Sequence, residues 1–394
     1  MRTTTFRDVL LEEIAEIKSG VGFPISMQGC ESGDFPFAKV GDISNRARSG
    51  EQFISDAPNW VKNEDLSTLK FTPFPTGTIV FAKIGEAIRK NFRAVSTRPM
   101  LFDNNVMGVI PQEERVDTTY LYFYLRTLDF YHLAGKTTVP AIRKSTIEKL
   151  KIPLPPLEEQ RRIAAILDKA DGVRRKRKEA IRLTEELLKS TFLEMFGDPV
   201  TNPKGWEKIK LGNLCTIVRG GSPRPINDYL GGSIPWIKIG DATEGDDIYI
   251  HKTAEAIKPD GVKKSRYLEP GSLIFANCGV SLGFARILKI AGCIHDGWLA
   301  FSDLDKSINQ IFLLKLLNSI TEHFRAIAPA GTQPNLNTTI MKNFEIPIPP
   351  IDLQEKFAVV SHYLTDIIQK NSEMFKESEN LFNSLLQRAF RGEL

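Results

Sequence analysis

Two long stretches of the chain have apolar residues mostly three or four positions apart, which is the spacing of one helix face. The apolar positions of the first are Ile163, Ile166, Ala170, Val173, Ala180, Ile181, Leu187, Leu188, Phe192 and Met195. Those of the second are Phe357, Val360, Leu364, Ile367, Met374, Phe375, Leu381, Phe382, Leu386 and Ala389. Each stretch follows a proline-rich segment, which cannot continue a helix because proline has no amide hydrogen. The pattern predicts two helices of about 40 residues, each roughly 60 Å long at 1.5 Å per residue.

The two helices belong to a module that occurs twice. Residues 138–160, TVPAIRKSTIEKLKIPLPPLEEQ, align with residues 332–354, TQPNLNTTIMKNFEIPIPPIDLQ, at a constant offset of 194, as from Ile152 to Ile346. The identical pairs are Thr138/Thr332, Pro140/Pro334, Ile152/Ile346, Pro153/Pro347, Pro155/Pro349, Pro156/Pro350 and Gln160/Gln354. Two copies of one unit generally present two similar surfaces, so we expect the protein to recognise a target with two parts.

Helices of this length cannot bury an apolar face inside a small domain. The natural arrangement is a coiled coil of the two, and pseudo-twofold symmetry between the repeats favours an antiparallel pair. The alternative is that each helix packs on its own globular half.

The globular halves carry matching strand-like segments. FPFAKVGDIS (35–44) resembles IPWIKIGDAT (234–243), and GTIVFAKIGEAI (77–88) resembles GSLIFANCGVSL (271–282). These segments predict short β-branched and aromatic strands bounded by glycine. Between them the halves differ almost completely. The expected fold is α+β, with two similar strand-rich globular domains separated by the two long helices, and with different surfaces on one scaffold.

Composition is that of an ordinary globular protein, with 42% hydrophobic and 25% charged residues among 394. No apolar run reaches the roughly 20 residues that span a bilayer, and the N-terminal segment carries acidic residues where a signal peptide is apolar. We therefore expect a cytoplasmic protein without a membrane partner. The cysteines, Cys30, Cys215, Cys278 and Cys293, form no CxxC pair and are interpreted as reduced core residues.

Signatures of catalysis are missing from the sequence. There is no GxxxxGK[ST] phosphate loop, no Asn/Asp-Pro-Pro-aromatic motif of an amino-methyltransferase, and Gly20-Val-Gly22 lacks the third glycine of a dinucleotide fingerprint. The dipeptide His295-Asp296 could suggest a metal site or a proton relay, but a single such pair is far more often structural. We predict no catalytic residue and no metal site.

Basic residues interleaved with aromatic ones form the better functional signal. A net charge of +4 is compatible with a polyanionic ligand, and Lys and Arg can hold phosphates or read base edges. The candidate DNA-binding residues are Lys83, Arg89, Lys90, Arg93, Lys136, Arg143 and Lys144 in the first half, and Arg219, Arg224, Lys252, Lys263, Lys264, Arg266 and Arg286 in the second. For any single one an ordinary solvated face is an equal alternative. The run at residues 174–178, RRKRK, is as compatible with a solvated helix surface as with a nucleic-acid stripe.

Several segments resemble the specificity subunit of type I restriction-modification systems. They are KIPLPPLEEQRRIAAILDKAD, TFLEMFGDPVTNPKGWEKIKLGNLCTIVRGGSPRP, SIPWIKIGDAT, PNLNTTIMKNFEIPIPPIDLQEKF and the terminal LLQRAFRGEL, and their order along nearly the whole chain is more specific than any one of them. The resemblance implies two target-recognition domains, residues 1–156 and 200–350, and two conserved helical regions, residues 157–199 and 351–394. The N-terminus departs from the pattern, since it lacks the Gly-Trp of residues 205–206.

The resemblance also implies a function. The chain is expected to read a bipartite, asymmetric duplex DNA site and to carry no cofactor or catalytic residue of its own. The partners implied are two copies of a modification subunit that uses S-adenosylmethionine, and restriction subunits that translocate DNA with ATP and Mg. Apolar helix positions expected to contact the modification subunits are Leu167, Leu183, Leu353 and Phe357. The alternatives are a self-contained nuclease or methyltransferase, and a scaffold whose two halves bind proteins.

Overall fold

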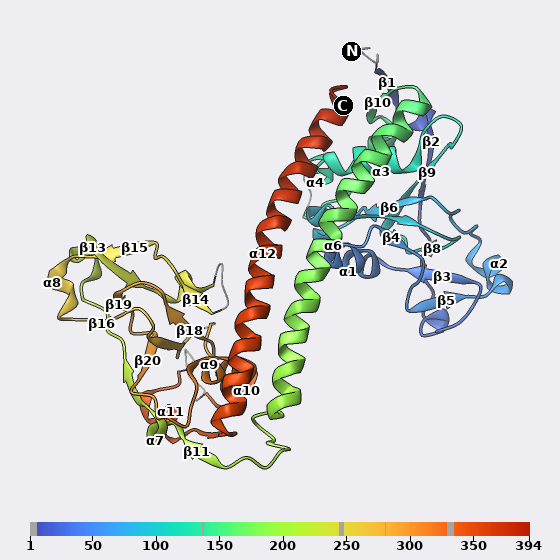
Figure 1. Cartoon of the computed structure of the whole chain (residues 1–394). Coiled ribbons are helices and arrows are strands. Elements are labelled where there is room, and N and C mark those ends of the chain that lie inside the picture. The colour runs from blue at the N-terminus through green and yellow to red at the C-terminus, as the bar shows by residue number, and fades with distance from the viewer. Residues whose placement is uncertain (1–5, 136–137, 244–247, 280, 329–334) are drawn as a thin grey trace. The chain divides into compact units, whose positions relative to one another are not determined.

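The computed structural model describes residues 6–135, 138–243, 248–279, 281–328 and 335–394 (Figure 1). The chain divides into two compact units. Unit 1 comprises Met1–Ala180 and Asn371–Leu394, and unit 2 comprises Ile181–Lys370. Each unit therefore combines one strand-rich half of the chain with part of both long helices. The sequence predicted four contiguous segments, residues 1–156, 157–199, 200–350 and 351–394. That division remains a prediction of where the target-recognition regions and the helical regions lie.

Unit 1 is built on three sheets. The strands are β1 (Arg7–Leu10), β2 (Ala15–Ser19), β3 (Phe35–Ala38), β4 (Phe53–Ile54), β5 (Asn59–Val61), β6 (Ile79–Ala82), β7 (Arg93–Ser96), β8 (Leu101–Phe102), β9 (Val106–Pro111) and β10 (Lys151–Leu154). They form sheets of order β2-β9-β6-β7-β4, β5-β3-β8 and β1-β10. The helices are α1 (Val40–Ser49), α2 (Leu66–Leu69), α3 (Thr118–Thr127), α4 (Phe130–Leu133), α5 (Lys144–Glu148) and the first part of α6 (Leu157–Phe196), with 3-10 turns η1 (Leu11–Glu13), η2 (Ile25–Met27), η3 (Asn63–Asp65) and η4 (Glu86–Lys90).

Unit 2 repeats this plan. Its strands are β11 (Lys208–Lys210), β12 (Thr216–Arg219), β13 (Leu230–Ile237), β14 (Tyr249–Ile250), β15 (Glu255–Ile257), β16 (Arg266–Leu268), β17 (Leu273–Ala276), β18 (Ala285–Leu288), β19 (Gly292–Ile294), β20 (Trp298–Ser302) and β21 (Glu345–Pro347). The sheets are β12-β20-β17-β18-β14, β15-β13-β19-β16 and β11-β21. The helices are α7 (Leu211–Leu214), α8 (Pro259–Val262), α9 (Gln310–Ser319), α10 (Thr321–Ile327), α11 (Thr338–Asn343), the last part of α6 and the first part of α12 (Ile351–Phe390), with η5 (Ile226–Asp228) and η6 (Ile239–Ala242). The last part of α12 belongs to unit 1. The α+β class and the internal repeat are confirmed, because the two five-stranded sheets have the same strand order. The second sheet of unit 2 differs from that of unit 1 by the additional strand β16.

The two long helices are confirmed at 40 residues each, and they pair antiparallel inside each unit. In unit 1 Arg162 of α6 donates to the carbonyl of Leu394 at 2.8 Å, whereas Arg174, farther along α6, pairs with Glu379, earlier in α12, at 3.7 Å. In unit 2 Phe357, near the start of α12, packs on Phe192 at the end of α6 with ring centroids 5.4 Å apart.

The alternative packing also holds in part, because the helices bury apolar residues in the cores of both units. Ile163, Ala164 and Leu167 of α6 belong to the main core of unit 1, together with Phe382 and Ala389 of α12. Leu188, Phe192 and Phe196 of α6 belong to the main core of unit 2, together with Phe357, Ala358 and Leu364 of α12. Each strand-rich region thus packs on a two-helix layer rather than on its own helix alone.

The repeated glutamine of the proline-rich segment explains why that motif occurs in both halves. The buried Gln160 side chain accepts the N–H of Asp117 at 2.9 Å and donates to the carbonyls of Arg115 and Pro155 at 3.2 and 2.9 Å. Gln354 does the same, accepting from Asn309 and donating to Ser307 and Pro349. Because Asp117 and Asn309 cap α3 and α9, each glutamine joins the start of a long helix to the start of a domain helix.

Two expectations from the sequence are corrected. Only the first parts of the segments 35–44 and 234–243 are strands, since α1 and η6 follow at once. The N–H groups of Lys39 and Lys238 donate to the carboxylates of Asp42 and Asp241 at 2.7 Å, and these contacts start the helical turns.

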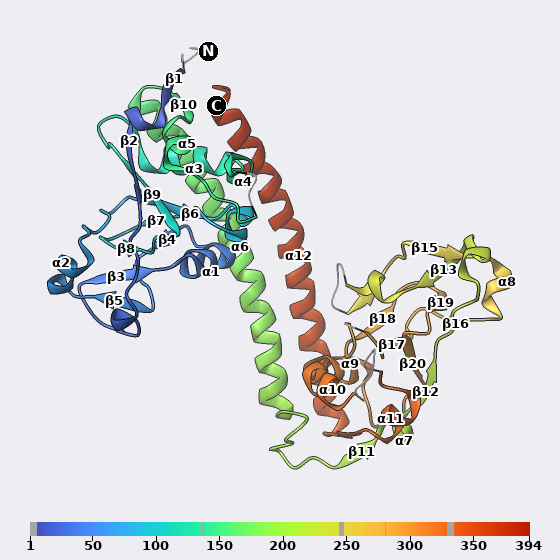
Figure 2. The same cartoon turned by 180° about the vertical axis from the view of Figure 1, so that it is seen from behind.

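The missing N-terminal Gly-Trp does not change the architecture of unit 1. In unit 2 Trp206 donates to the carbonyl of Phe196 at 2.9 Å, so this residue anchors the chain where α6 ends. In unit 1 the ring of Phe6 lies at the corresponding place, 3.7 Å from where a Cβ atom on Gly392 would be, just beyond the end of α12. β1 pairs with β10 as β11 pairs with β21, and Figure 2 shows β1 beside the last turns of α12.

Candidate nucleic-acid interface

A glycine at the same place in each unit fixes the loop that follows the edge strand. Gly20 follows β2, and a Cβ atom there would lie 2.0 Å from the carbonyl oxygen of Asp103. Gly220 follows β12, and a Cβ atom there would lie 2.2 Å from the carbonyl oxygen of His295. No side chain fits at such distances. The backbone of both loops is therefore held against the end of the strand pair β3/β8 or β13/β19.

The side chains on these equivalent loops differ. Pro24 precedes η2 in unit 1 and Pro225 precedes η5 in unit 2, and the residue before this proline is Phe23 in unit 1 and Arg224 in unit 2. Two residues beyond β8 and β19, unit 1 has Asn104 and unit 2 has Asp296. One backbone arrangement thus presents two different sets of polar groups.

In unit 2 this place gathers three exposed arginines from separate segments. Arg219 donates from Nε to the carbonyl of Asp296 at 2.8 Å, and Arg266 donates from Nε to the carbonyl of Arg219 at 2.9 Å. Arg224 lies 3.6 Å from the carboxylate of Asp296, measured from Nη2 to Oδ2, while its side chain remains 81% exposed. The hydroxyl of Ser265 donates to the carbonyl of Gly221 at 2.7 Å, which joins the loop to β16. We call this set, Arg219, Arg224, Arg266, Ser222, His295 and Asp296, the arginine cluster.

The Asp296 carboxylate is held in its charged form. Burial raises its pKa, but the hydrogen bond from Ser222 and the charges of Arg219 and Arg224 outweigh burial, so the pKa lies below its ordinary value. Ser222 Oγ donates to Oδ1 at 2.8 Å. An ionised carboxylate that accepts several bonds is a rigid partner for a guanidinium.

His295 is a neutral component of the cluster. Its Nδ1 accepts the N–H of Gly297 at 2.9 Å, so the ring proton lies on Nε2, which is 3.0 Å from Asp296 Oδ1. Burial lowers the pKa of His295, against the opposing charge of Asp296. The His295-Asp296 pair is therefore a structural support for the loop, as the sequence favoured.

The other candidates in unit 2 lie apart from this contact network. Lys264 donates to the hydroxyl of Tyr229 at 2.5 Å, and Arg286 stacks over Phe284 at 4.8 Å and is half-buried. Lys252 and Lys263 are exposed. For these four residues, a role in DNA binding remains a prediction from the sequence.

In unit 1 the candidates occupy the loops after β6 and before α5. Lys83 donates to Ser19 Oγ at 3.0 Å, and its carbonyl accepts the N–H of Ile142, the residue before Arg143. Arg89 stacks on the ring of Tyr131 at 4.0 Å and pairs with Glu86 at 3.0 Å. Lys90, Arg143 and Lys144 are exposed, and Lys144 pairs with Glu148 at 3.5 Å. Lys136 lies outside the described residues.

Arg93 is a correction to the predicted set. It is 4% exposed, stacks over Phe130 at 3.8 Å and donates from Nη2 to the carbonyl of Leu128 at 3.0 Å. Burial lowers its pKa to about 9, which still leaves it charged at neutral pH. Because its donors are directed to backbone carbonyls inside the unit, Arg93 supports the fold and does not face a phosphate.

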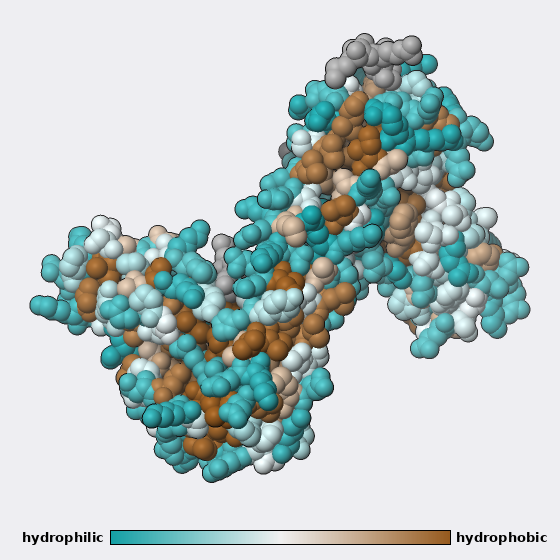
Figure 3. Space-filling model, in the orientation of Figure 1, coloured by the Kyte–Doolittle hydropathy of each residue, from teal (hydrophilic) through white to brown (hydrophobic). Residues whose placement is uncertain are grey.

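The helix positions expected to meet partner subunits also need revision. Leu167 and Phe357 are fully buried and pack in the cores, so their side chains offer no docking surface. Leu183 is 51% exposed and Leu353 is partly buried. Val359 and Tyr363, one turn apart on α12, are the most exposed of the large apolar residues on the long helices, at 71% and 67%. Figure 3 shows apolar surface at several places along the two long helices.

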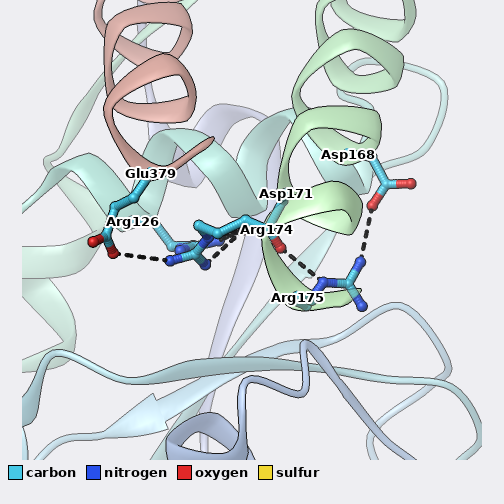
Figure 4. Close-up of polar contacts among 6 residues, drawn as sticks. All are labelled: Arg126, Asp168, Asp171, Arg174, Arg175 and Glu379. Carbon is cyan, nitrogen blue, oxygen red and sulfur yellow. Dashed lines mark hydrogen bonds and ion pairs between the residues drawn. The ribbon is translucent and has the colours of Figure 1, made fainter. Parts of the chain in front are cut away.

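The basic run at residues 174–178 serves the interior of unit 1. The Asp171 carboxylate is 2% exposed and binds Arg174 at 2.7 Å, Arg175 at 3.0 Å and Arg126 of α3 at 3.4 Å (Figure 4). Lys178 donates to the carbonyl of Arg48 at the end of α1, at 2.9 Å. These contacts exclude a nucleic-acid stripe for most of the run, since three of its five side chains are used inside the unit.

Sequence reasoning missed several polar residues of the loops. Lys39 and Lys238 occupy equivalent positions, Lys39 bonding to Gln28 Oε1 at 3.0 Å and Lys238 pairing with Glu255. The signal was present, since both lie in the repeated K-x-G-D segment that was used only to predict strands. Ser222 and Asp296 carried no pattern of their own.

The family model for the type I restriction modification DNA specificity domain matches residues 4–183 and again residues 203–377. The chain belongs to this family. The two matches correspond to the two copies of the repeat, and the model describes DNA specificity. The reading of the chain as a type I specificity protein is thereby confirmed.

Known members and solved structures agree with this assignment. The chain is 24% identical to the type I restriction enzyme MjaIX specificity subunit of Methanocaldococcus jannaschii, over 98% of this chain and 92% of the relative. It is 23% identical to a putative type I specificity subunit of Haemophilus influenzae, S.HindORF215P, over 91% and 96%. The fold resembles the crystal structure of the S subunit of M. genitalium, with a TM-score of 0.64, 16% identity and coverage of 99% and 97%. A chain from a study of the assembly and conformational transition of a type I R-M system matches with a TM-score of 0.53, 21% identity and coverage of 99% and 98%.

The described part of the specificity chain contains no group of three or more His, Cys, Asp or Glu side chains arranged to bind a metal ion. Within the same residues, no helix is both long and apolar enough to cross a bilayer. Cys215 and Cys293 are core residues, as expected, and burial raises the pKa of Cys215 to about 12. Cys30 is exposed, which corrects the expectation that all four cysteines are internal.

Proposed function

We propose that this chain is the DNA-recognition subunit of a type I restriction-modification complex and that each unit reads one half of a bipartite, asymmetric duplex site. The target-recognition regions would be residues 1–156 and 200–350, with residues 157–199 and 351–394 as the helical regions between them. The carrying observation is the pair of equivalent loops fixed by Gly20 and Gly220, which have the same backbone position and different polar side chains. An asymmetric DNA site requires different recognition side chains in the two units, and here the same backbone arrangement carries them.

The exposed basic residues around these loops suit two roles in DNA binding. Exposed lysines elsewhere on the two units, such as Lys90 and Lys263, can bind phosphates without regard to sequence. An arginine paired with a carboxylate, as Arg224 is with Asp296, can read base edges. Arg89 is also held in place, because it donates to the hydroxyl of Tyr131 at 2.5 Å and pairs with Glu86 at 3.0 Å.

Catalysis would reside in the partner subunits. Two modification subunits would use S-adenosylmethionine to methylate adenine, and restriction subunits would use ATP and Mg. The exposed apolar pair Val359 and Tyr363 on α12 is the best candidate contact for one modification subunit. Because the chain is internally duplicated, a two-to-one assembly is expected, and native mass spectrometry at saturation measures it. A one-to-one complex would contradict this stoichiometry.

Methylome sequencing tests the central proposal. Cells that express this chain with its modification subunit should acquire methyladenine in a gapped motif, and cells that lack the chain should not. Replacing Arg89 and Lys90 together by alanine should weaken binding through one half-site and reduce the salt dependence, by roughly one in slope for each lost phosphate contact. Replacing the exposed Lys62 and Lys70, which lie outside the predicted set, is the matched control. Methylation or cleavage by the purified chain alone would favour the rival reading as a self-contained enzyme.

A further inference from the structure

Arg224 combines high exposure with an ion pair to a partly buried carboxylate. Its side chain is 81% exposed, yet one terminal nitrogen lies 3.6 Å from a carboxylate that is only 28% exposed. That carboxylate, Asp296, receives a bond from Ser222 at 2.8 Å and contacts His295 at 3.0 Å. A guanidinium anchored on one side keeps its remaining donors for a ligand on the other side.

The loop that carries Arg224 is itself held rigidly. A Cβ atom on Gly221 would lie 2.9 Å from the carbonyl oxygen of Lys264, so backbone packs directly on backbone at this residue as it does at Gly220. The N–H of Gly221 donates to the carbonyl of Ile294 at 3.1 Å, which ties the loop to β19. A side chain on a rigid loop loses little conformational entropy when it binds a ligand. This favours selectivity between similar ligands.

The neighbouring arginines suit a different task. Arg219 and Arg266 each use Nε for a backbone carbonyl, at 2.8 and 2.9 Å, and neither has an ion-pair partner among the described residues. Their terminal nitrogens are suited to phosphate oxygens on either side of a base contact. The three side chains together form a cationic surface with one charge, that of Arg224, fixed by a carboxylate.

We propose that Arg224 is a base-reading residue of unit 2 and that it recognises a guanine through the O6 and N7 acceptors in the major groove, while Asp296 holds it in place. This inference rests on the proposed function. Guanine is the base that presents two adjacent acceptors to a forked donor, and arginine is the side chain with that geometry. Unit 1 has Phe23 and Asn104 at the equivalent positions, so the contact belongs to one half-site only.

A methylome experiment with the assembled modification complex tests the inference. The wild-type motif must contain a G·C pair in one half-site. Arg224→Ala and Arg224→Lys should both relax the preference at that pair by roughly 5- to 150-fold, the range of one bidentate contact, and leave every position of the other half-site unchanged. Arg224→Lys retains the charge, so a residue that only binds phosphate would keep the motif intact in this variant.

Two further variants separate base reading from general binding. Asp296→Asn keeps an acceptor for Ser222 but weakens the anchor of Arg224, and it should relax the same G·C pair to a smaller extent. Arg266→Ala should leave the motif unchanged and reduce the salt slope of binding by roughly one.

The outcomes also distinguish the inference from the function on which it rests. A wild-type complex with no gapped motif would overturn the proposed function. A gapped motif without a G·C pair in either half-site, or an unchanged motif in both Arg224 variants, would overturn the role of Arg224 and leave the proposed function standing. Uniformly weaker methylation with the same motif would reassign Arg224 to phosphate binding.

Discussion

Asp171 offers a strong test of how unit 1 is held together. Its carboxylate is 2% exposed and contacts three arginines from two helices, while Arg174 also pairs with Glu379 of α12 at 3.7 Å. Figure 4 shows that this carboxylate lies between the guanidinium groups of Arg126 and Arg175. Asp171→Ala removes the anion and leaves the cations in a partly buried place, which is the costly way to break an ion pair.

The expected loss of stability depends on which ion-pair partners each arginine keeps when Asp171 is replaced. Arg174 keeps Glu379, and Arg175 keeps Asp168 at 3.8 Å, although both carboxylates are about half exposed. Arg126 has no second ion-pair partner in the described part of unit 1 and remains stacked near Phe382, 5.3 Å from the ring centre. Since water can reach the arginines in part, we expect the low end of the range for a broken buried pair, about 3 kcal/mol. For a unit of about 200 residues this lowers Tm by roughly 6–12 °C.

Thermal unfolding of the full chain, followed by circular dichroism and by proteolysis of unit 1, measures this loss. Asp168→Ala is the matched control, because it removes an exposed carboxylate from the same helix and should cost under about 1 kcal/mol. Limited proteolysis should show that the Asp171→Ala variant opens near α3 before unit 2 unfolds. If the two variants melt within about 2 °C of each other, given the usual 2–4 °C per kcal/mol, the network does not hold the unit together.

Three further perturbations test other parts of the argument. Gly20→Ala should destabilise unit 1 by about 2 kcal/mol or more in chemical denaturation, whereas Gly22→Ala, whose Cβ atom has no neighbour within 4 Å, should not; equal midpoints would contradict the close approach. Gln354→Ala leaves the N–H of Asn309 and two carbonyls without this buried partner, so the free energy of unfolding of the variant should fall by about 1–3 kcal/mol. Replacing the exposed Gln369 by alanine is the control for helix composition. Burial lowers the pKa of His295, so its stabilising contribution is complete above the ordinary pKa of 6.5 and is lost as pH falls through the lower folded pKa. Tm measured between pH 7 and pH 5 should therefore fall more in the wild type than in His295→Gln, and parallel curves would refute this linkage.

Much of the fold was predictable because it depends on local pattern. The three-and-four spacing of apolar residues and the prolines before Leu157 and Ile351 predicted the two long helices with nearly the observed bounds. The offset between Gln160 and Gln354 predicted the repeat, since a buried glutamine that binds three backbone groups cannot change without loss in either copy. Where prediction was wrong, as for the helical turns after Lys39 and Lys238, a short capping contact outweighed the strand pattern.

The candidate site was predictable only as a set of residue types. Sequence indicated Arg93 and Arg224 equally, because both are arginines near aromatic residues. The tertiary structure separated them, since Arg93 lies under Phe130 with its donors on backbone carbonyls, whereas Arg224 stands exposed beside Asp296. The sequence by itself determined the two helices, the duplication and the family, because all three depend on the spacing and order of residues along the chain. Only the fold decided which charges are buried and which are presented, because that depends on contacts between residues far apart in the chain.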